Sequence, residues 1–243
     1  MNNGQQVVIL KEGGEQKSGR GALKNNIAAA KAIADGVRST LGPKGMDKML
    51  VDSVGEVTIT NDGATILKTV DIEHPAAKAV AQIALTQEQE AGDGTTTSVL
   101  LAGEILKECE RLIDANVHPT IICQGLREAA EVATQALKLA AGHLKEKQLA
   151  QIANTSLNSK SAKGNADMLS SYAITAVSNA SRSNDGRIDM RDVQVMARVG
   201  VSVADPTIVP GGVIDREIAL PTMPKQVEGP ILFLDAVIGI ENI

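Results

Sequence analysis

The chain has 243 residues, of which 43% are hydrophobic and 22% are charged, so its composition is that of a globular protein with room for one large domain or two smaller ones. Because it contains one Tyr, one Phe and no Trp, its core must be aliphatic, and base stacking is not expected as a way of binding nucleic acid. The formal net charge of -5, without a basic block, also argues against nucleic acid as a partner.

Membrane insertion and disulfide bonding are not expected either. No uncharged apolar run approaches the roughly 18 residues of a membrane span, and no basic segment precedes a long apolar stretch at the N-terminus. The sequence therefore predicts a cytoplasmic protein with no membrane partner. Cys109 and Cys123 form no C-x-x-C pair and lie in segments with helical periodicity, so we expect both to be small buried side chains in a reducing compartment.

The first predicted elements are an arm, a helix and a hairpin. Residues 1–20 combine a short β-prone piece with a Gly-rich, charged stretch. Residues 25–42 have apolar side chains at helical spacing and end in a GPKG stop. Residues 49–60 predict two short strands around a glycine-containing turn, and the start of a second helix follows in residues 61–70.

Three longer helices are predicted next, beginning at Pro75, at residue 95 and at residue 118. The helix from residue 95 has an apolar stripe formed by Leu101, Ile105, Cys109 and Leu112. The helix from residue 118 has a second stripe formed by Ile122, Leu126, Ala133 and Leu137. Many alanines favour close helix packing, so this region predicts a helix bundle with a small β-hairpin.

The pattern changes in the last third of the chain. Residues 154–166 are expected to be a polar loop, and residues 165–180 return to a helical pattern. Residues 188–224 contain short β-branched runs with Pro and Gly, which predict strands and turns. Residues 229–243 indicate a further, buried strand.

Three glycine-containing motifs are candidates for chemistry: LGPKG at residues 41–45, NDGAT at 61–65 and GDGTTT at 92–97. Glycine lets a backbone approach a ligand, and a helix N-terminus offers free N–H groups and a positive dipole end to an anion. Three consecutive threonines are poor in a helix interior but suit its first turn, where hydroxyls can meet a phosphate. Asp93 could bind Mg²⁺, and Asp62 could orient a water.

Each motif also has a simpler interpretation. LGPKG can be a helix stop with a turn, NDGAT a capped turn, and GDGTTT a capped helix start. Their occurrence together favours a nucleotide site, and neither a P-loop nor a G-x-G-x-x-G fingerprint is present, so the site would be of another type. Lys160, in a polar stretch, is a cation for a terminal phosphate or simply a solvated lysine.

Four longer stretches contain these motifs: VRSTLGPKGMDKMLVDSVGEVTITNDGATILK, HPAAKAVAQIA, AGDGTTTSVLLAGEIL and HPTIICQGLREA. They closely resemble the group II chaperonins, the family of the archaeal thermosome and its eukaryotic cytosolic relatives. The resemblance runs from about residue 6 to the end and is strongest to the archaeal type.

The resemblance implies a fold class and a division into domains. Residues 1–145 match the N-terminal part of an equatorial ATP-binding domain, residues 146–212 the first pass of an intermediate domain, and residues 213–243 the start of an apical domain. The implied fold is mainly α with α+β portions. It comprises an equatorial helical bundle with a small β-hairpin, part of an α/β intermediate domain and the first strands of an apical domain.

The resemblance also assigns roles to residues. It implies that Leu41, Gly42 and Pro43 contact the nucleotide, that Asp62 helps to position the attacking water, and that Lys160 senses the γ-phosphate. Asp93 is the implied Mg²⁺ ligand. The implied phosphate-binding loop consists of Gly92, Asp93, Gly94, Thr95, Thr96 and Thr97.

The implied function is that of a chaperonin subunit, which hydrolyses ATP with Mg²⁺ to fold client proteins inside a double ring. Its partners would be unfolded or partly folded proteins and the same or related subunits. Family members are roughly twice as long as this chain, and the resemblance implies that a water-activating aspartate of the intermediate domain lies in the part not matched. The chain is thus expected to be a piece of a longer protein, a shortened non-catalytic assembly protein, or a fragment without an independent fold.

Overall fold

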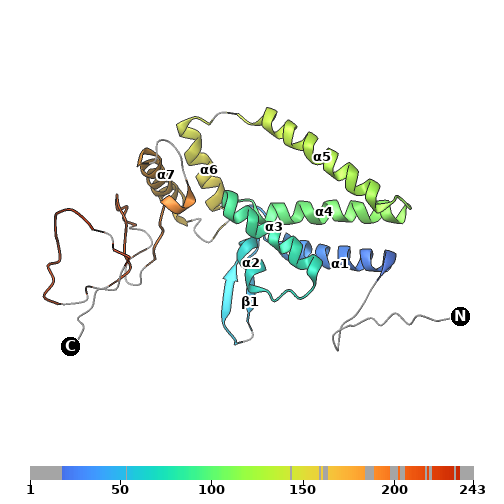
Figure 1. Cartoon of the computed structure of the whole chain (residues 1–243), viewed down its shortest axis with the longest axis horizontal. Coiled ribbons are helices and arrows are strands. Elements are labelled where there is room, and N and C mark those ends of the chain that lie inside the picture. The colour runs from blue at the N-terminus through green and yellow to red at the C-terminus, as the bar shows by residue number, and fades with distance from the viewer. Residues whose placement is uncertain are drawn as a thin grey trace.

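A computed structural model describes residues 18–52, 54–142, 144–158, 160, 164–183, 189–197, 202, 206–216, 218, 221–232 and 234–235 (Figure 1). Of the arm expected at residues 1–20, residues 1–17 lie outside the described residues, and Gly19 and Arg20 belong to the first helix. Of the strand expected at residues 229–243, residues 233 and 236–243 lie outside the described residues. In chain order the elements are α1 (Gly19–Arg38), β1 (Lys48–Val51), β2 (Val57–Thr60), α2 (Gly63–Thr69), α3 (Pro75–Ala91), α4 (Thr95–Asp114), α5 (Pro119–Ala140), α6 (Glu146–Asn158), α7 (Ala166–Ser183) and the 3-10 helix η2 (Met190–Asp192).

The core lies where α1, α3 and α4 pack together, with the short helix α2 against them. Helices α1 and α4 approach closely because Gly103 has no side chain: a Cβ there would lie 2.4 Å from the Cβ of Ala34. The helix bundle with a hairpin that the sequence predicts is therefore confirmed. Its buried residues are Ala30, Ala34, Val37, Ile66, Leu67, Val80, Ala81, Ala84, Val99 and Leu100.

The hairpin pairs β1 and β2 in antiparallel register, with Lys48 opposite Thr60 and Val51 opposite Val57. Its turn is held by Asp52, whose Oδ1 accepts hydrogen bonds from the N–H groups of Val54 and Glu56 at 2.9 and 2.8 Å. Leu50 packs against the core, whereas the opposite face of the strands is exposed. The hairpin expected at residues 49–60 is thus present.

Most residues of the apolar stripe predicted for α4 do not lie in the core. Leu101 and Leu112 are 60% and 45% exposed, and of the four predicted residues only Cys109 is buried. The core face of α4 instead contains Val99, Leu100 and Gly103. This helix is apolar on two sides, and the side carrying a glycine packs on α1 because it permits the closer approach.

Among the described residues, helix α5 packs on α4 mainly near its beginning. Ile122 is its buried residue, whereas Leu126 and Leu137 from the predicted stripe are 40% and 71% exposed. Cys123, next to Ile122, is exposed, so the expectation of two buried cysteines is wrong for this one. Successive helix residues point in directions about 100° apart, so only one of the two can face α4.

A groove of about 490 Å³ separates the C-terminal half of α4 from the first half of α5. Its wall is mostly apolar, and buried Cys109 lies in it. Burial raises the pKa of the Cys109 thiol above its ordinary value, and the neighbouring Cys123 adds to that shift. The lining residues include Ile105, Cys109, Leu112, Ile121, Ile122 and Leu126.

Helices α6 and α7 pack mainly against each other. The polar loop expected from residue 154 begins later, because α6 continues to Asn158. Polar side chains in the last turns of α6 are hydrogen-bonded while the backbone stays helical. Asn154 Nδ2 donates to Asp167 Oδ1 at 2.7 Å, and Thr155 Oγ1 donates to Gln151 O at 2.8 Å. The helix predicted for residues 165–180 is confirmed as α7.

In the described residues between 189 and 235, the structure has η2, turns and irregular backbone but no strand, contrary to the strands expected there. Ile231 and Leu232, expected in a buried strand, are 80% and 78% exposed. β-branched composition favours a strand only where a partner strand supplies the ladder, and the described residues offer none here.

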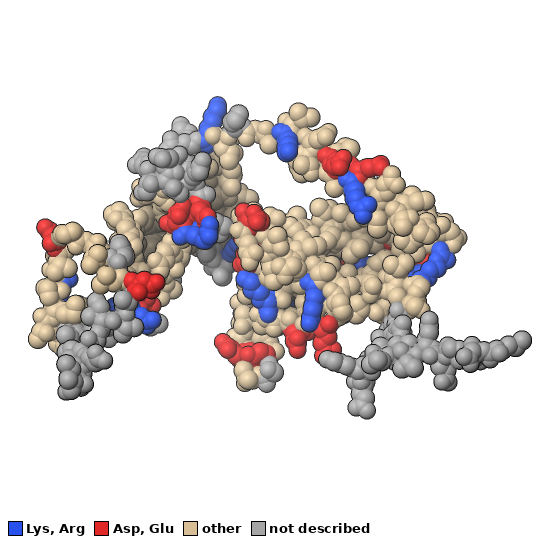
Figure 2. Space-filling model, viewed as in Figure 1, with Lys and Arg blue, Asp and Glu red and all other residues tan. Residues whose placement is uncertain are grey.

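The surface carries charges of both signs. On the face in Figure 2, basic and acidic side chains are interspersed over the helices and do not gather by sign. None of the described helices combines the length and hydropathy that crossing a bilayer requires.

Candidate nucleotide site

The turn between α3 and α4 consists of residues 92–94 and depends on two glycines in the left-handed region. Gly92 has φ 68° and Gly94 has φ 78°, a backbone conformation that other residues rarely adopt. The Gly92 N–H donates to the carbonyls of Gln87 and Glu88, which ends α3. Gln87 Nε2 also donates to Asp93 O at 2.9 Å. The turn is therefore held from α3 before α4 begins.

The first turn of α4 has no side-chain cap. Its N-cap is Gly94, which has no side chain to offer, whereas α2, α3 and α5 are capped by Asp62, His74 and His118. Ser98 is the first residue whose N–H bonds back, to Gly94 O at 3.0 Å. The N–H groups of residues 95–97 are thus left for an anion, next to the threonine hydroxyls that follow the turn.

Asp93 is exposed at the tip of this turn. Within the described part of the chain its carboxylate has no hydrogen-bond or ion-pair partner, and no group of three or more His, Cys, Asp or Glu residues gathers to bind a metal. A hard cation here would take Asp93 as one ligand and complete its shell with phosphate oxygens and water, as Mg²⁺ commonly does. The donor set therefore fits Mg²⁺ bound together with a phosphate.

Asp62 caps the next helix start in the chain. Its Oδ2 accepts two hydrogen bonds from Thr65, from N–H and from Oγ1, both at 2.9 Å, while its own N–H donates to Thr60 Oγ1 at 3.1 Å. Both side-chain bonds use Oδ2, so Oδ1 remains an acceptor. The carboxylate is fixed in orientation yet keeps one oxygen that can accept a hydrogen bond from a water.

Gly63 brings Asp62 to the first turn of α4. A Cβ at position 63 would lie 2.5 Å from Thr96 Oγ1 and 3.1 Å from Thr96 N, so the start of α2 rests directly on α4. Two of the three motifs, NDGAT and GDGTTT, are therefore in contact although they are far apart in sequence.

The LGPKG motif forms a closed turn after α1. Gly42 has φ 85°, and the Gly45 N–H donates to Gly42 O at 2.8 Å. Leu41 and Pro43 are exposed. The Ser39 hydroxyl is buried and has no hydrogen-bond partner among the described residues.

This turn and the start of α4 lie at the same end of the helix pair. Helices α1 and α4 run antiparallel, since Arg20 near the start of α1 donates to Ile113 O, whereas Arg38 at its end pairs with Glu104. Figure 1 shows the end of α1, the hairpin and the start of α2 meeting near the middle of the molecule. NDGAT and GDGTTT are thus in contact, and LGPKG lies at the same end of the α1–α4 pair.

Lys160 lies between α6 and α7, where its backbone N–H donates to Leu157 O at 3.0 Å. Its side chain is half-buried, and no hydrogen bond or ion pair joins it to residues 92–97 in the described structure. The described contacts therefore join Asp62 to the start of α4, and they link neither Lys160 nor residues 41–43 to it.

Some supporting residues give no signal in the sequence. Gln87 holds the phosphate turn through Asp93 O, but a glutamine in an amphipathic helix does not indicate this. Gly63 belongs to the NDGAT motif, but a larger residue is excluded there because its Cβ would clash with Thr96 of α4. Such contacts depend on tertiary packing and not on a local pattern.

Comparison with known proteins shows the family of the chain. The sequence model of the TCP-1/cpn60 chaperonin family matches residues 33–242. Thermosome subunit beta of Archaeoglobus fulgidus is 46% identical over 245 residues, which cover 98% of this chain and 45% of that protein. Thermosome subunit alpha of the same organism is 49% identical over 230 residues, 93% of this chain and 42% of the relative.

The thermosome subunit of Pyrococcus abyssi is 46% identical over 230 residues, again 93% of this chain and 42% of the relative. The chain therefore spans less than half the length of these curated relatives. The match covers most of the chain, including all three motifs. The predicted relationship to the group II chaperonins is confirmed, and the chain belongs to the TCP-1/cpn60 chaperonin family.

Proposed function

We propose that this chain binds Mg·ATP at the N-terminus of α4, as part of an ATP-hydrolysing chaperonin subunit. The observation that supports this most directly is the uncapped first turn of α4, which follows two left-handed glycines and contacts the start of α2. Relatives named thermosome subunits match this chain over nearly its whole length. In the complete subunit, hydrolysis would drive folding of unfolded or partly folded proteins inside a ring of the same or related subunits.

The roles of the residues follow from their positions. The N–H groups and hydroxyls of Thr95, Thr96 and Thr97 would bind phosphate oxygens, with Gly92 and Gly94 admitting them to the backbone. Asp93 would hold Mg²⁺, which when bound neutralises charge on the phosphates. The remaining Asp62 oxygen would accept a hydrogen bond from the attacking water and orient it.

The predicted site residues that lie outside the contact between α2 and α4 would have supporting roles. Leu41, Gly42 and Pro43 would contact the nucleotide from the turn after α1. Lys160 would sense the terminal phosphate after a movement of α6 and α7 toward the turn, and such rearrangements are common where a ligand completes a site. Residues 1–145 would then be the N-terminal part of the equatorial domain, 146–212 the first pass of the intermediate domain and 213–243 the start of the apical domain.

Titration calorimetry with Mg·ATP on the full chain tests the site. Replacing Asp93 by Ala should weaken ATP binding in the presence of Mg²⁺ and leave the weaker Mg²⁺-free binding almost unchanged, because the carboxylate acts through the cation. Asp71→Ala, which removes another exposed acidic side chain, is the matched control and should bind like the wild type. Equal Mg²⁺-dependent affinity in Asp93→Ala and wild type would refute the assignment.

A non-catalytic assembly protein is the second candidate. The exposed apolar sides of α5 and of the hairpin favour it, because large apolar patches commonly mark contact surfaces. ATP turnover and molar mass of the full chain in solution separate the two functions. A stable ring without turnover supports the assembly protein, whereas turnover by a small species excludes it.

A further inference from the structure

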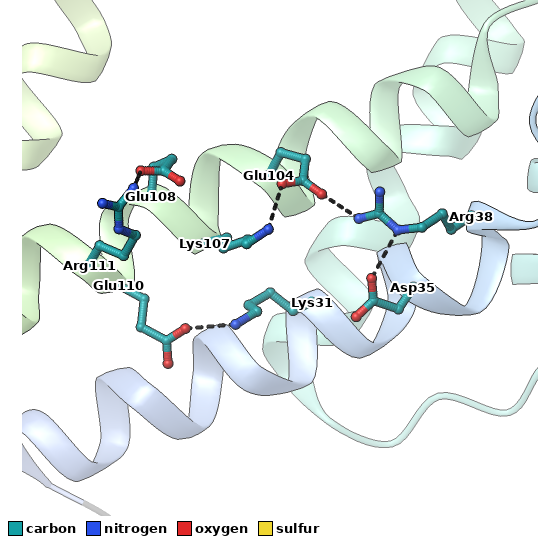
Figure 3. Close-up of polar contacts among 8 residues, drawn as sticks. All are labelled: Lys31, Asp35, Arg38, Glu104, Lys107, Glu108, Glu110 and Arg111. Carbon is teal, nitrogen blue, oxygen red and sulfur yellow. Dashed lines mark hydrogen bonds and ion pairs between the residues drawn. The ribbon is translucent and has the colours of Figure 1, made fainter.

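Arg38 ends α1 and links it to α4. Its Nε donates to Asp35 Oδ1 at 3.2 Å, one turn earlier on α1, and its Nη2 donates to Glu104 Oε1 on α4. Figure 3 shows the guanidinium between these two carboxylates, with Lys107 Nζ reaching the second oxygen of Glu104 at 3.3 Å. One side chain therefore connects the last turn of α1 with the neighbouring helix.

The turn that follows Arg38 is fastened to the end of α1. Thr40 is buried, and its Oγ1 donates to Val37 O at 2.8 Å. The Met46 N–H donates to Ser39 O at 2.8 Å, and a Cβ on Gly45 would lie 2.1 Å from Thr40 O. Residues 41–45 thus form a closed loop that must move together with the last turn of α1.

Among the described residues, the pair of Arg38 with Glu104 is the α1–α4 ion pair that lies nearest to this loop. The others, Lys31 with Glu110 and Lys24 with Asp114, lie progressively farther toward the opposite end of the pair. Glu104 is nine residues from Thr95, which corresponds to about 14 Å along the helix axis. Beyond the core packing of α1 on α4, Arg38 is therefore the charged contact that joins the last turn of α1, which carries the loop, to α4.

We propose that Arg38 is a positioning residue for nucleotide binding, which holds the residue 41–43 turn beside the start of α4 by joining Asp35 to Glu104. This inference rests on the function proposed above, because it takes that turn to contact the nucleotide. The Arg38 guanidinium is charged at physiological pH, and its hydrogen bonds, first to Glu104 and then to Asp35, raise its pKa further.

The test compares Arg38→Met with Lys31→Met in the full chain. Each change removes one α1–α4 ion pair and leaves an unbranched apolar side chain, but Lys31 lies about two turns before Arg38 and so farther from the loop. Urea unfolding measures the stability of each variant, and titration calorimetry measures its affinity for Mg·ATP. We expect similar losses of stability, but a loss of affinity only in Arg38→Met, of about two- to fivefold, the size typical of an exposed ion pair.

Two further variants separate positioning from folding. Glu104→Gln removes the same link from the α4 side and should weaken ATP binding as Arg38→Met does. Arg38→Lys keeps the charge but not the planar fork that reaches two carboxylates, so its affinity should be intermediate. Equal affinities in Arg38→Met, Lys31→Met and wild type overturn the inference alone, whereas a wild type that does not bind Mg·ATP overturns the proposed function as well.

Discussion

Gly63 has no room for a side chain, and this makes it a sensitive probe of the site. Replacement by Ala would force a Cβ to 2.5 Å from Thr96 Oγ1 and 3.1 Å from the Thr96 backbone, so the start of α2 must move away from α4. We expect Gly63→Ala to lose about 1–3 kcal/mol in urea unfolding. ATP turnover in the complete subunit should fall further than ATP affinity, because Asp62 moves with the helix.

Gly36→Ala is the matched control for that substitution. Position 36 lies within α1, and nothing stands within 4 Å of the Cβ that the change would add. The same chemical change should therefore raise stability by about 0.5–1 kcal/mol, as alanine does within a helix. If Gly63→Ala were equally stabilising, the contact between α2 and α4 would be looser than described.

At the residue scale, the sequence reveals the three glycine-containing motifs better than the residues that support them. The motifs at residues 41–45, 61–65 and 92–97 can be recognised locally, because the backbone conformation at a helix end itself favours glycine and threonine. Gln87 and Gly63 serve the same site through contacts with other segments. Their roles follow from packing, which a local pattern does not encode.

At the scale of elements, the contact between α1 and α4 should depend on pH. The pKa of Glu104 lies below its ordinary value, first because Arg38 donates to the carboxylate and then because Lys107 does. A carboxyl with a lowered folded-state pKa stabilises the fold above its unfolded-state pKa, and this contribution is lost as pH falls through the folded-state value.

Comparison of wild type with Glu104→Gln isolates this contribution. We expect the difference in unfolding free energy to be complete above about pH 5 and to shrink at lower pH as the carboxyl becomes protonated. Urea unfolding of both proteins from about pH 7 to about pH 3 measures it. A difference that stays constant over this range would show that the Glu104 charge does not hold the helices together.

Helix starts are predictable here, and buried faces are less so. His74 and His118 each accept a hydrogen bond from the residue two positions on, and each precedes a proline that begins the helix, so α3 and α5 start where the sequence predicts. The apolar sides of α4 and α5 are wider than the faces that become buried. In α4 the buried side is the one that contains Gly103, because α1 can approach closely only there. A local pattern in α4 does not reveal this, since it depends on Ala34 of α1.

At the scale of the whole molecule, α5 should be the weakly held helix of the bundle. Val132 and Leu137 are 66% and 71% exposed, whereas Ile122 is buried against Cys109 and Ile113. We expect Ile122→Ala to cost about 2–4 kcal/mol, and Val132→Lys to stay within about 0.5 kcal/mol of wild type. Urea unfolding measures both changes.

Dye binding and hydrogen exchange complete this test. Val132→Lys should also bind less of a hydrophobic dye, since it removes apolar surface that the fold leaves exposed. Amides in the second half of α5 should exchange faster than those of α4, because they have fewer buried contacts. Equal protection along both helices would mean that α5 is covered in solution.

The helical class and the hairpin could be predicted because they depend on local periodicity and on turns. Whether residues 188–224 form strands could not be decided from a local pattern, since a strand requires a partner, and the described residues there provide none. The polar loop predicted from residue 154 begins only after α6 ends at Asn158, for a related reason. Asn154 bonds to Asp167 on α7, so a polar side chain that usually ends a helix is satisfied within one.

The short connection between α3 and α4 has a mechanical consequence. Residues 92–94 are all that separates the two helices, and both ends of this turn are bonded to helix backbone. Such a connection has no spare length with which to close over a ligand by itself. If phosphate binds there as proposed, any displacement of the turn would also displace the ends of α3 and α4, so these two helices would carry the movement into the bundle.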